Sequence, residues 1–192
     1  MESLKKMISL YGTIPSDGVV KVDSFLNHMI DPNLILEIGK ELAERFNFEK
    51  IDKILTIEAS GIAPALGVAF TLGVPVLFAK KSLPSTMKAS YQSEVNSFTK
   101  KKNYTIFVSE EYISKDEKIL IVDDFLAMGH SLLAMNDIIH QAGAQCVGAG
   151  IVIEKSFQQG RQILESQGMR IESLVRIKNL SVKEGFIFYD SI

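Results

Sequence analysis

One segment, residues 118–134, limits the possible folds of this chain more than any other. It reads KILIVDDFLAMGHSLLA: an apolar run, two adjacent aspartates, a short loop with a glycine, and a helix-like pattern. A short continuous apolar run is typical of a strand that is buried on both faces. Such a strand followed directly by a helix predicts a parallel sheet with crossover helices.

The same alternation of strand and helix runs through most of the chain. Asp31 followed by Pro32 predicts a helix start, and apolar residues at every fourth position predict one buried face for a helix over 31–46. Further strands are expected at 53–57, 74–79 and 147–154, and further helices at about 64–72, 131–142 and 161–167. The sequence therefore predicts an α/β fold, an open and mainly parallel sheet flanked by helices.

The length of 192 residues corresponds to one ordinary α/β domain. We expect a single domain over 1–192 with a core at about 31–158. Residues 1–30 do not follow the alternation, and 159–192 lie beyond it with two strand-like pieces, RIESLVRI and GFIFYD. We expect these two ends to form a small hood beside the sheet.

Residues 80–103 interrupt the pattern with a polar stretch that has no convincing helical period. Residues 93–99 and 104–109 can pair as a hairpin across the turn KKKN at 100–103, which leaves 81–92 as a long mobile loop. Loops of this length in a compact domain are usually functional or disordered.

Composition excludes several classes of partner and site. Lys and Arg number 21 against 23 Asp and Glu, a net charge of −2, so neither nucleic acid nor an anionic membrane is expected as the main partner. A single cysteine, Cys146, excludes an intramolecular disulfide and a cysteine-built zinc site. The three histidines are scattered, so no metal held by protein side chains alone is expected. Because no signal peptide and no apolar run near the ~18 residues of a membrane span is visible, we expect a cytoplasmic protein.

The residues after the strand at 118–122 suggest a site for a phosphorylated sugar. Asp123 and Asp124 only accept hydrogen bonds, so the two hydroxyls of a diol are natural partners. Residues 127–131 run into a helix N-terminus, where backbone N–H groups and the helix dipole bind phosphate; Gly129 permits close approach and Ser131 can add a hydroxyl while capping the helix. The alternative is that the aspartates merely end a strand and Ser131 merely caps a helix.

Two further segments fit such a site. The backbone N–H groups of residues 59–61 can cradle a diphosphate, although Ser60 can equally be a simple helix cap with Pro64 in the first turn. Lys155 follows an apolar strand, and its donor-only ammonium suits the O6 carbonyl of a 6-oxopurine and disfavours adenine. Phe157 can lie against the plane of a base, and the amide of Asn27 can donate to a second carbonyl or can simply shape a turn.

The pattern ILIVDDFLAMGHS resembles the signature of the type I phosphoribosyltransferases, which bind 5-phosphoribosyl 1-diphosphate (PRPP). Met128 departs from that signature, which commonly has Thr or Asn at this position. The segments VDSFLNHMIDP, TIEASGIAPA, SFTK and GIVIEKSFQQGR are similar to the bacterial xanthine phosphoribosyltransferases of this family and span nearly the whole chain in the expected order.

The resemblance implies a type I phosphoribosyltransferase fold and a purine-salvage reaction, in which xanthine and PRPP give xanthosine 5′-monophosphate and pyrophosphate. It implies Mg²⁺ bound mainly through PRPP or pyrophosphate, a homodimer, and a lid at about 82–96. Asp123 and Asp124 would be catalytic. The implied PRPP-binding residues are Ala127, Met128, Gly129, His130, Ser131, Ala59, Ser60, Gly61 and Lys81, the last often acting in the neighbouring subunit's site. The implied base-binding residues are Val20, Asn27, Lys155 and Phe157.

Two alternatives remain at this point. A sibling enzyme acting on guanine or hypoxanthine fits most of the same residues, because the amide of Asn27 can flip to accept from a 2-amino group. A PRPP-sensing transcription regulator is less expected, because such a protein needs an added DNA-binding element with a basic face.

Overall fold

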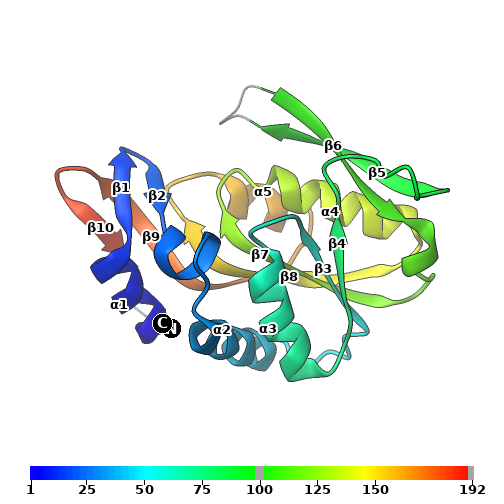
Figure 1. The fold of residues 1–192 in the computed structure, drawn as a ribbon, viewed down its shortest axis with the longest axis horizontal. Coiled ribbons are helices and arrows are strands. Elements are labelled where there is room, and N and C mark those ends of the chain that lie inside the picture. The colour runs from blue at the N-terminus through cyan, green and yellow to red at the C-terminus, as the bar shows by residue number, and fades with distance from the viewer. Residues whose placement is uncertain (98–101, 190–192) are drawn as a thin grey trace.

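The computed structural model describes residues 1–97 and 102–189, and its centre is one twisted sheet (Figure 1). The strand order is β10-β9-β8-β7-β3-β4. Strands β3, β4, β7, β8 and β9 are parallel, and β10 is antiparallel to β9. Their bounds are β3 Lys53–Ile57, β4 Val76–Ala79, β7 Lys118–Leu126, β8 Gln145–Lys155, β9 Ile171–Ser181 and β10 Gly185–Phe188. The predicted mainly parallel α/β sheet is confirmed.

Helices cover both faces of this sheet (Figure 1). Helices α1 (Glu2–Tyr11), α2 (Pro32–Arg45) and α3 (Ile62–Leu72) pack on one face, and α4 (His130–Gln141) and α5 (Gly160–Ser166) on the other. The predicted start of α2 is confirmed, because the Asp31 carboxylate accepts hydrogen bonds from the N–H groups of Asn33 and Leu34. Among the residues that the structure describes, no helix is both long and apolar enough to span a membrane.

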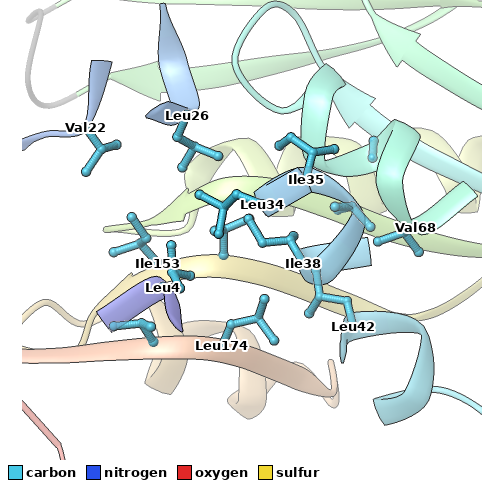
Figure 2. Packing of buried hydrophobic residues seen from close by; sticks show 14 of the residues in the cluster. Leu4, Val22, Leu26, Leu34, Ile35, Ile38, Leu42, Val68, Ile153 and Leu174 are labelled. Carbon is cyan, nitrogen blue, oxygen red and sulfur yellow. The ribbon is translucent and has the colours of Figure 1, made fainter. Parts of the chain in front are cut away.

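The apolar run in β7 supplies the core on both sides. Leu120 and Val122 join the cluster under α1, α2 and α3, whereas Ile119 and Ile121 join the cluster under α4 and α5. Successive side chains of a strand point to opposite faces, so a strand covered on both sides has to be apolar throughout. Figure 2 shows the first of these clusters, in which Leu34, Ile38 and Leu42 of α2 lie against Ile153 and Leu174 of the sheet.

The C-terminal strands belong to this sheet. We expected 159–192 to join 1–30 in a hood, but β9 pairs with β8 over Ala149–Lys155 and therefore continues the sheet. The N-terminal part does lie beside it, as strands β1 (Thr13–Ser16) and β2 (Val19–Lys21) and a short π-helical turn over Asp23–Asn27. Residues 190–192 of the expected hood lie outside the described residues.

The predicted hairpin exists and is longer than expected. Strands β5 (Ser90–Ser97) and β6 (Lys102–Ser109) pair antiparallel, so the loop that precedes them ends by residue 89 rather than 92. In β5 the exposed fraction alternates, with Val95 buried and Glu94 exposed, and this period of two explains why a polar-looking segment forms a strand. The expected lid at 82–96 therefore includes a strand. Of the expected turn at 100–103, residues 100 and 101 lie outside the described residues, and 102 and 103 begin β6.

Candidate active site

A pocket of about 550 Å³ lies where β7 and β8 end. Ligands of open α/β sheets bind beyond the carboxyl ends of the strands, and the pocket has the size of a small-molecule site. It brings together Asp123, the loop 127–131 and Lys155. Three predicted parts of the site therefore line the same pocket.

The aspartate pair is part of the strand rather than of the loop behind it. Strand β7 continues to Leu126 because Phe125 and Leu126 pair with β8, so Asp123 and Asp124 are only 5% and 7% exposed. The backbone N–H of Asp124 donates to Asp123 Oδ1 at 3.0 Å. Burial raises the pKa of the Asp123 carboxyl well above its usual range, and the neighbouring Asp124 adds to the shift. Asp123 therefore holds its proton to a higher pH than an ordinary aspartate.

The loop 127–129 leads into the N-terminus of α4. Gly129 has a φ of 82°, a left-handed conformation that favours glycine, and it occupies the N-cap position. We expected Ser131 to cap the helix, but α4 begins at His130, and no side-chain hydrogen bond caps it. Because the first N–H groups of a helix have no acceptor within it, this end of α4 favours an anion such as a phosphate.

The second loop, between β3 and α3, lies against the aspartate pair. A Cβ atom added to Gly61 would lie 2.8 Å from Asp123 Oδ1 and would collide with Thr56 Oγ1. Gly61 rather than Ser60 is the N-cap of α3, while Ala59 is exposed. Gly61 and the Asp123 side chain thus lie close together at the carboxyl ends of adjacent strands.

Lys155 is the last residue of β8, at the mouth of the pocket. Its Nζ donates to the carbonyl of Gly18 at 3.2 Å and lies 5.6 Å from the centre of the Phe125 ring. Burial lowers the pKa of Lys155, and the Asp124 carboxylate opposes this shift. The Lys155 ammonium therefore lies between Gly18 of the N-terminal segment and the face of the Phe125 ring.

Asn27 and Val20 lie on the N-terminal side of the site. Asn27 Nδ2 donates to Asp124 Oδ2 at 2.9 Å, and its Oδ1 is buried without a hydrogen-bond partner among the described residues. Val20 packs against the core, while its neighbours Gly18 and Val19 line the pocket. The side-chain amide of Asn27, an expected base-binding residue, is therefore hydrogen-bonded to the aspartate pair.

Neither Phe157 nor Lys81 lines this pocket, although the positive charge of Lys81 lies near enough to act on the Asp123 carboxyl. Phe157 is 39% exposed and lines a separate hollow beside α5. Lys81 is exposed, its backbone N–H donates to Glu58 Oε1 at 2.6 Å, and its Nζ lies 5.7 Å from the centre of the Tyr104 ring. The expected base contact of Phe157 and PRPP contact of Lys81 stay predictions.

Sequence reasoning missed several residues that line the pocket, among them Phe125, Val95 and Tyr104. Phe125 follows the aspartate pair directly, and this adjacency could have identified it. Val95 and Tyr104 come from the hairpin, and nothing in their local sequence indicates that β5 packs on α4 beside the phosphate loop. Their place depends on tertiary packing alone.

Comparison with known proteins assigns the chain to a family. A family model described as the phosphoribosyl transferase domain matches residues 28–170. The xanthine phosphoribosyltransferase of Staphylococcus carnosus is 49% identical over 182 residues, which are 94% of this chain and 95% of the relative. That of Ectopseudomonas mendocina is 54% identical over 181 residues, again 94% and 95%. The chain belongs to the phosphoribosyltransferase family.

The predicted type I phosphoribosyltransferase resemblance is thereby confirmed, and solved structures agree on the fold. The adenine phosphoribosyltransferase of Thermoanaerobacter pseudethanolicus superposes with a TM-score of 0.76 at 22% identity, covering 90% of this chain and 99% of the other. That of Rhodothermus marinus also gives 0.76 at 22% identity, covering 92% and 97%. At this identity the likeness concerns the architecture of a phosphoribosyltransferase and not the choice of base.

Proposed function

We propose that this chain is a xanthine phosphoribosyltransferase of purine salvage, which converts xanthine and PRPP to xanthosine 5′-monophosphate and pyrophosphate. One observation carries the proposal: a single pocket joins Asp123 of the buried carboxylate pair, a helix N-terminus without a side-chain cap, and a lysine against an aromatic ring. These groups match a ribose diol, a phosphate and a 6-oxopurine, respectively. The near-full-length similarity to proteins named xanthine phosphoribosyltransferase supports the same base.

In this proposal the two loops hold PRPP by backbone N–H groups. Residues 127–131 bind the 5-phosphate at the start of α4, where the helix dipole favours negative charge. Residues 59–61 bind the diphosphate, and because Gly61 lies close to Asp123, the leaving group lies beside the carboxylates that hold the ribose hydroxyls. Catalysis is then mainly positioning together with electrostatic stabilisation of the developing positive sugar.

Lys155 donates to the C6 carbonyl in this proposal, and Phe125 offers the base a ring face. Adenine carries an amine donor at C6, so the ammonium repels it from the same position. Because Asn27 Nδ2 is engaged by Asp124, the side-chain oxygen of Asn27 is the atom left for a base N–H. The hairpin residues Val95 and Tyr104 close the side of the pocket and help to keep water from the reactive sugar carbon.

Mg²⁺ belongs to the proposal through the substrate. No group of three or more His, Cys, Asp or Glu side chains suited to a metal ion is present in the described ranges 1–97 and 102–189. Asp123 lines the pocket, so its carboxylate oxygens fit the outer surroundings of an ion held chiefly by diphosphate and ribose oxygens. When bound, the ion neutralises charge on the departing pyrophosphate.

A homodimer in the cytoplasm completes the proposal. An apolar groove of about 820 Å³ on α2 and α3 supports the dimer. Its lining consists of apolar residues, proline and glycine, and its Phe70 is 79% exposed. Exposed apolar patches of this kind commonly mark protein interfaces. Residues lining the groove are Ile30, Pro32, Ile35, Leu36, Ala63, Leu66, Gly67, Ala69, Phe70, Gly73, Val74, Pro75 and Val76.

Pyrophosphate release with PRPP, Mg²⁺ and each free purine base tests the function. We expect the highest kcat/KM with xanthine and no turnover with adenine. A higher kcat/KM with guanine or hypoxanthine would assign the sibling activity instead. No release with any base, together with tight PRPP binding, would favour the PRPP-sensing regulator.

A further inference from the structure

Glu154 is a buried carboxylate that the proposed reaction does not use. It precedes Lys155 on β8, and its side chain is 1% exposed. Its oxygens accept hydrogen bonds from Ser156 Oγ and Ser173 Oγ, both at 2.6 Å, and from Arg161 and Arg176. A charge buried this deeply is costly unless it is paired, so the chain holds this cluster at a definite geometry.

Arg161 is the principal partner of Glu154. Its Nε lies 3.0 Å from both carboxylate oxygens, and its Nη2 donates to Oε2 at 2.6 Å. The same guanidinium donates to Ser173 Oγ and to the carbonyl of Ile171 on β9. Arg161 stands in the first turn of α5, so these bonds attach the start of that helix to β8 and β9.

The start of α5 lies directly behind the loop that is proposed to bind phosphate. The N–H of Gly160 donates to the carbonyl of Ala127 at 3.1 Å, and a Cβ on Gly160 would collide with that carbonyl. A Cβ on Gly129 would lie 3.2 Å from Leu164, one turn further along α5. Since no side chain fits between them, the position of α5 sets the position of the loop.

We propose that Glu154 and Arg161 are positioning residues, which fix the phosphate loop relative to Lys155. Contacts lead from the loop through Gly160 and Arg161 to Glu154, the residue next to Lys155 in the strand. The pair would hold the phosphate end of the site in the position that binds PRPP, beside the base end at Lys155. This inference rests on the proposed function, because it assigns those two ends.

The substitution Glu154→Gln tests the pair, because it keeps the shape and removes the charge. We expect KM for PRPP to rise about tenfold, equivalent to about 1.4 kcal/mol, while kcat at saturating PRPP changes less than about threefold. Glu165→Gln is the matched control: it removes the exposed partner of Arg161 and leaves Glu154 intact, so KM for PRPP should not change. Kinetics are measured well below the melting temperature of each variant.

Arg161→Gln, alone and combined with Glu154→Gln, completes the test. If the pair acts as a unit, the double variant raises KM for PRPP no more than either single change does. KM values within about twofold of wild type, with only the melting temperature lowered, would overturn the proposal, since a merely structural role predicts that result. Failure of both single variants to fold would overturn it as well, in favour of a role in the fold. Absence of turnover of xanthine and PRPP by the wild-type protein would instead refute the proposed function.

Discussion

The central residues of the site are two carboxylates that the fold pays to bury. Asp123 and Asp124 are adjacent, nearly inaccessible and close to a third polar group, the amide of Asn27. Burial of a charge destabilises a protein unless the charge is paired, and carboxyls with a raised pKa, such as Asp123, concentrate at functional sites. Their local energetics therefore oppose stability and favour a role in binding.

The substitution Asp123→Asn separates the effect of this carboxyl on stability from its role in the site. The pKa of Asp123 is raised in the folded state, so its contribution to stability is complete below the unfolded pKa of about 3.9 and is lost as pH rises through the folded pKa. Asparagine does not titrate, so the variant undergoes no such loss. The melting temperature of the variant should therefore rise relative to that of the wild type as the pH rises. Melting curves at several pH values measure this difference. A gap that stays constant with pH would contradict the shift.

Turnover should move in the opposite direction. We expect the double variant Asp123→Asn, Asp124→Asn to lose about 10²-fold or more in kcat, the effect of removing preorganised charge from a reacting centre. Steady-state kinetics at saturating PRPP and xanthine provide the measurement. Near-normal turnover would remove the aspartates from the mechanism.

Lys155 gives the sharpest prediction about the base. In Lys155→Ala the C6 carbonyl loses a charged hydrogen-bond donor, which costs about 1.5–3 kcal/mol, or a drop of about 10- to 150-fold in kcat/KM for xanthine. The affinity for PRPP should barely change. Lys183→Ala, in the exposed turn after β9, is the control. A variant that binds PRPP weakly but keeps its KM for xanthine would place the lysine at the diphosphate.

Local sequence predicted the pocket residues whose position depends on their neighbours in the chain. The aspartate pair lies near the end of a buried strand and the loop 127–131 follows that strand, so the order alone places them at the carboxyl ends of the parallel strands. Phe157 was expected at the base because it lies two residues after Lys155 in the sequence. The chain turns after β8, where the N–H of Gln158 donates to the carbonyl of Lys155, and the Phe157 ring lines a different hollow. Tyr104 reaches the pocket by packing of the hairpin, which no local pattern encodes.

At the scale of elements, the turn between β7 and α4 is the part most sensitive to change. In Gly129→Val a branched residue would have to adopt a φ of 82°, and its Cβ would press on Leu164. We expect PRPP binding to be abolished, as measured by calorimetry. Met128→Thr restores the common family residue at the neighbouring position and should bind PRPP at least as well as wild type. Unchanged affinity in Gly129→Val would show that the phosphate binds elsewhere.

The elements themselves differ in how well sequence predicts them. Strand β7 and helix α2 were predictable because burial on both faces and an Asp31 cap leave strong local signals. Strand β9 was expected in the hood although the short helix before it, α5 of 7 residues, was itself predicted. Its parallel pairing with β8 depends on sheet geometry rather than on its own residues.

At the scale of the whole molecule, the apolar groove on α2 and α3 predicts association. Phe70→Asp places a charge at its most exposed ring and should shift the protein from dimer to monomer in analytical ultracentrifugation. Phe48→Asp is the control, because Phe48 is also exposed, at 60%, but does not line the groove. A Phe70→Asp protein that sediments as wild type does would place the interface elsewhere.

The most direct test of the account is the identity of the product. The wild-type protein is incubated with xanthine, PRPP and Mg²⁺, and all products are quantified by chromatography and mass spectrometry. We predict equal amounts of xanthosine 5′-monophosphate and pyrophosphate, formed only when xanthine is present. Pyrophosphate accompanied by ribose 5-phosphate, whether or not a base is present, would contradict transfer to xanthine.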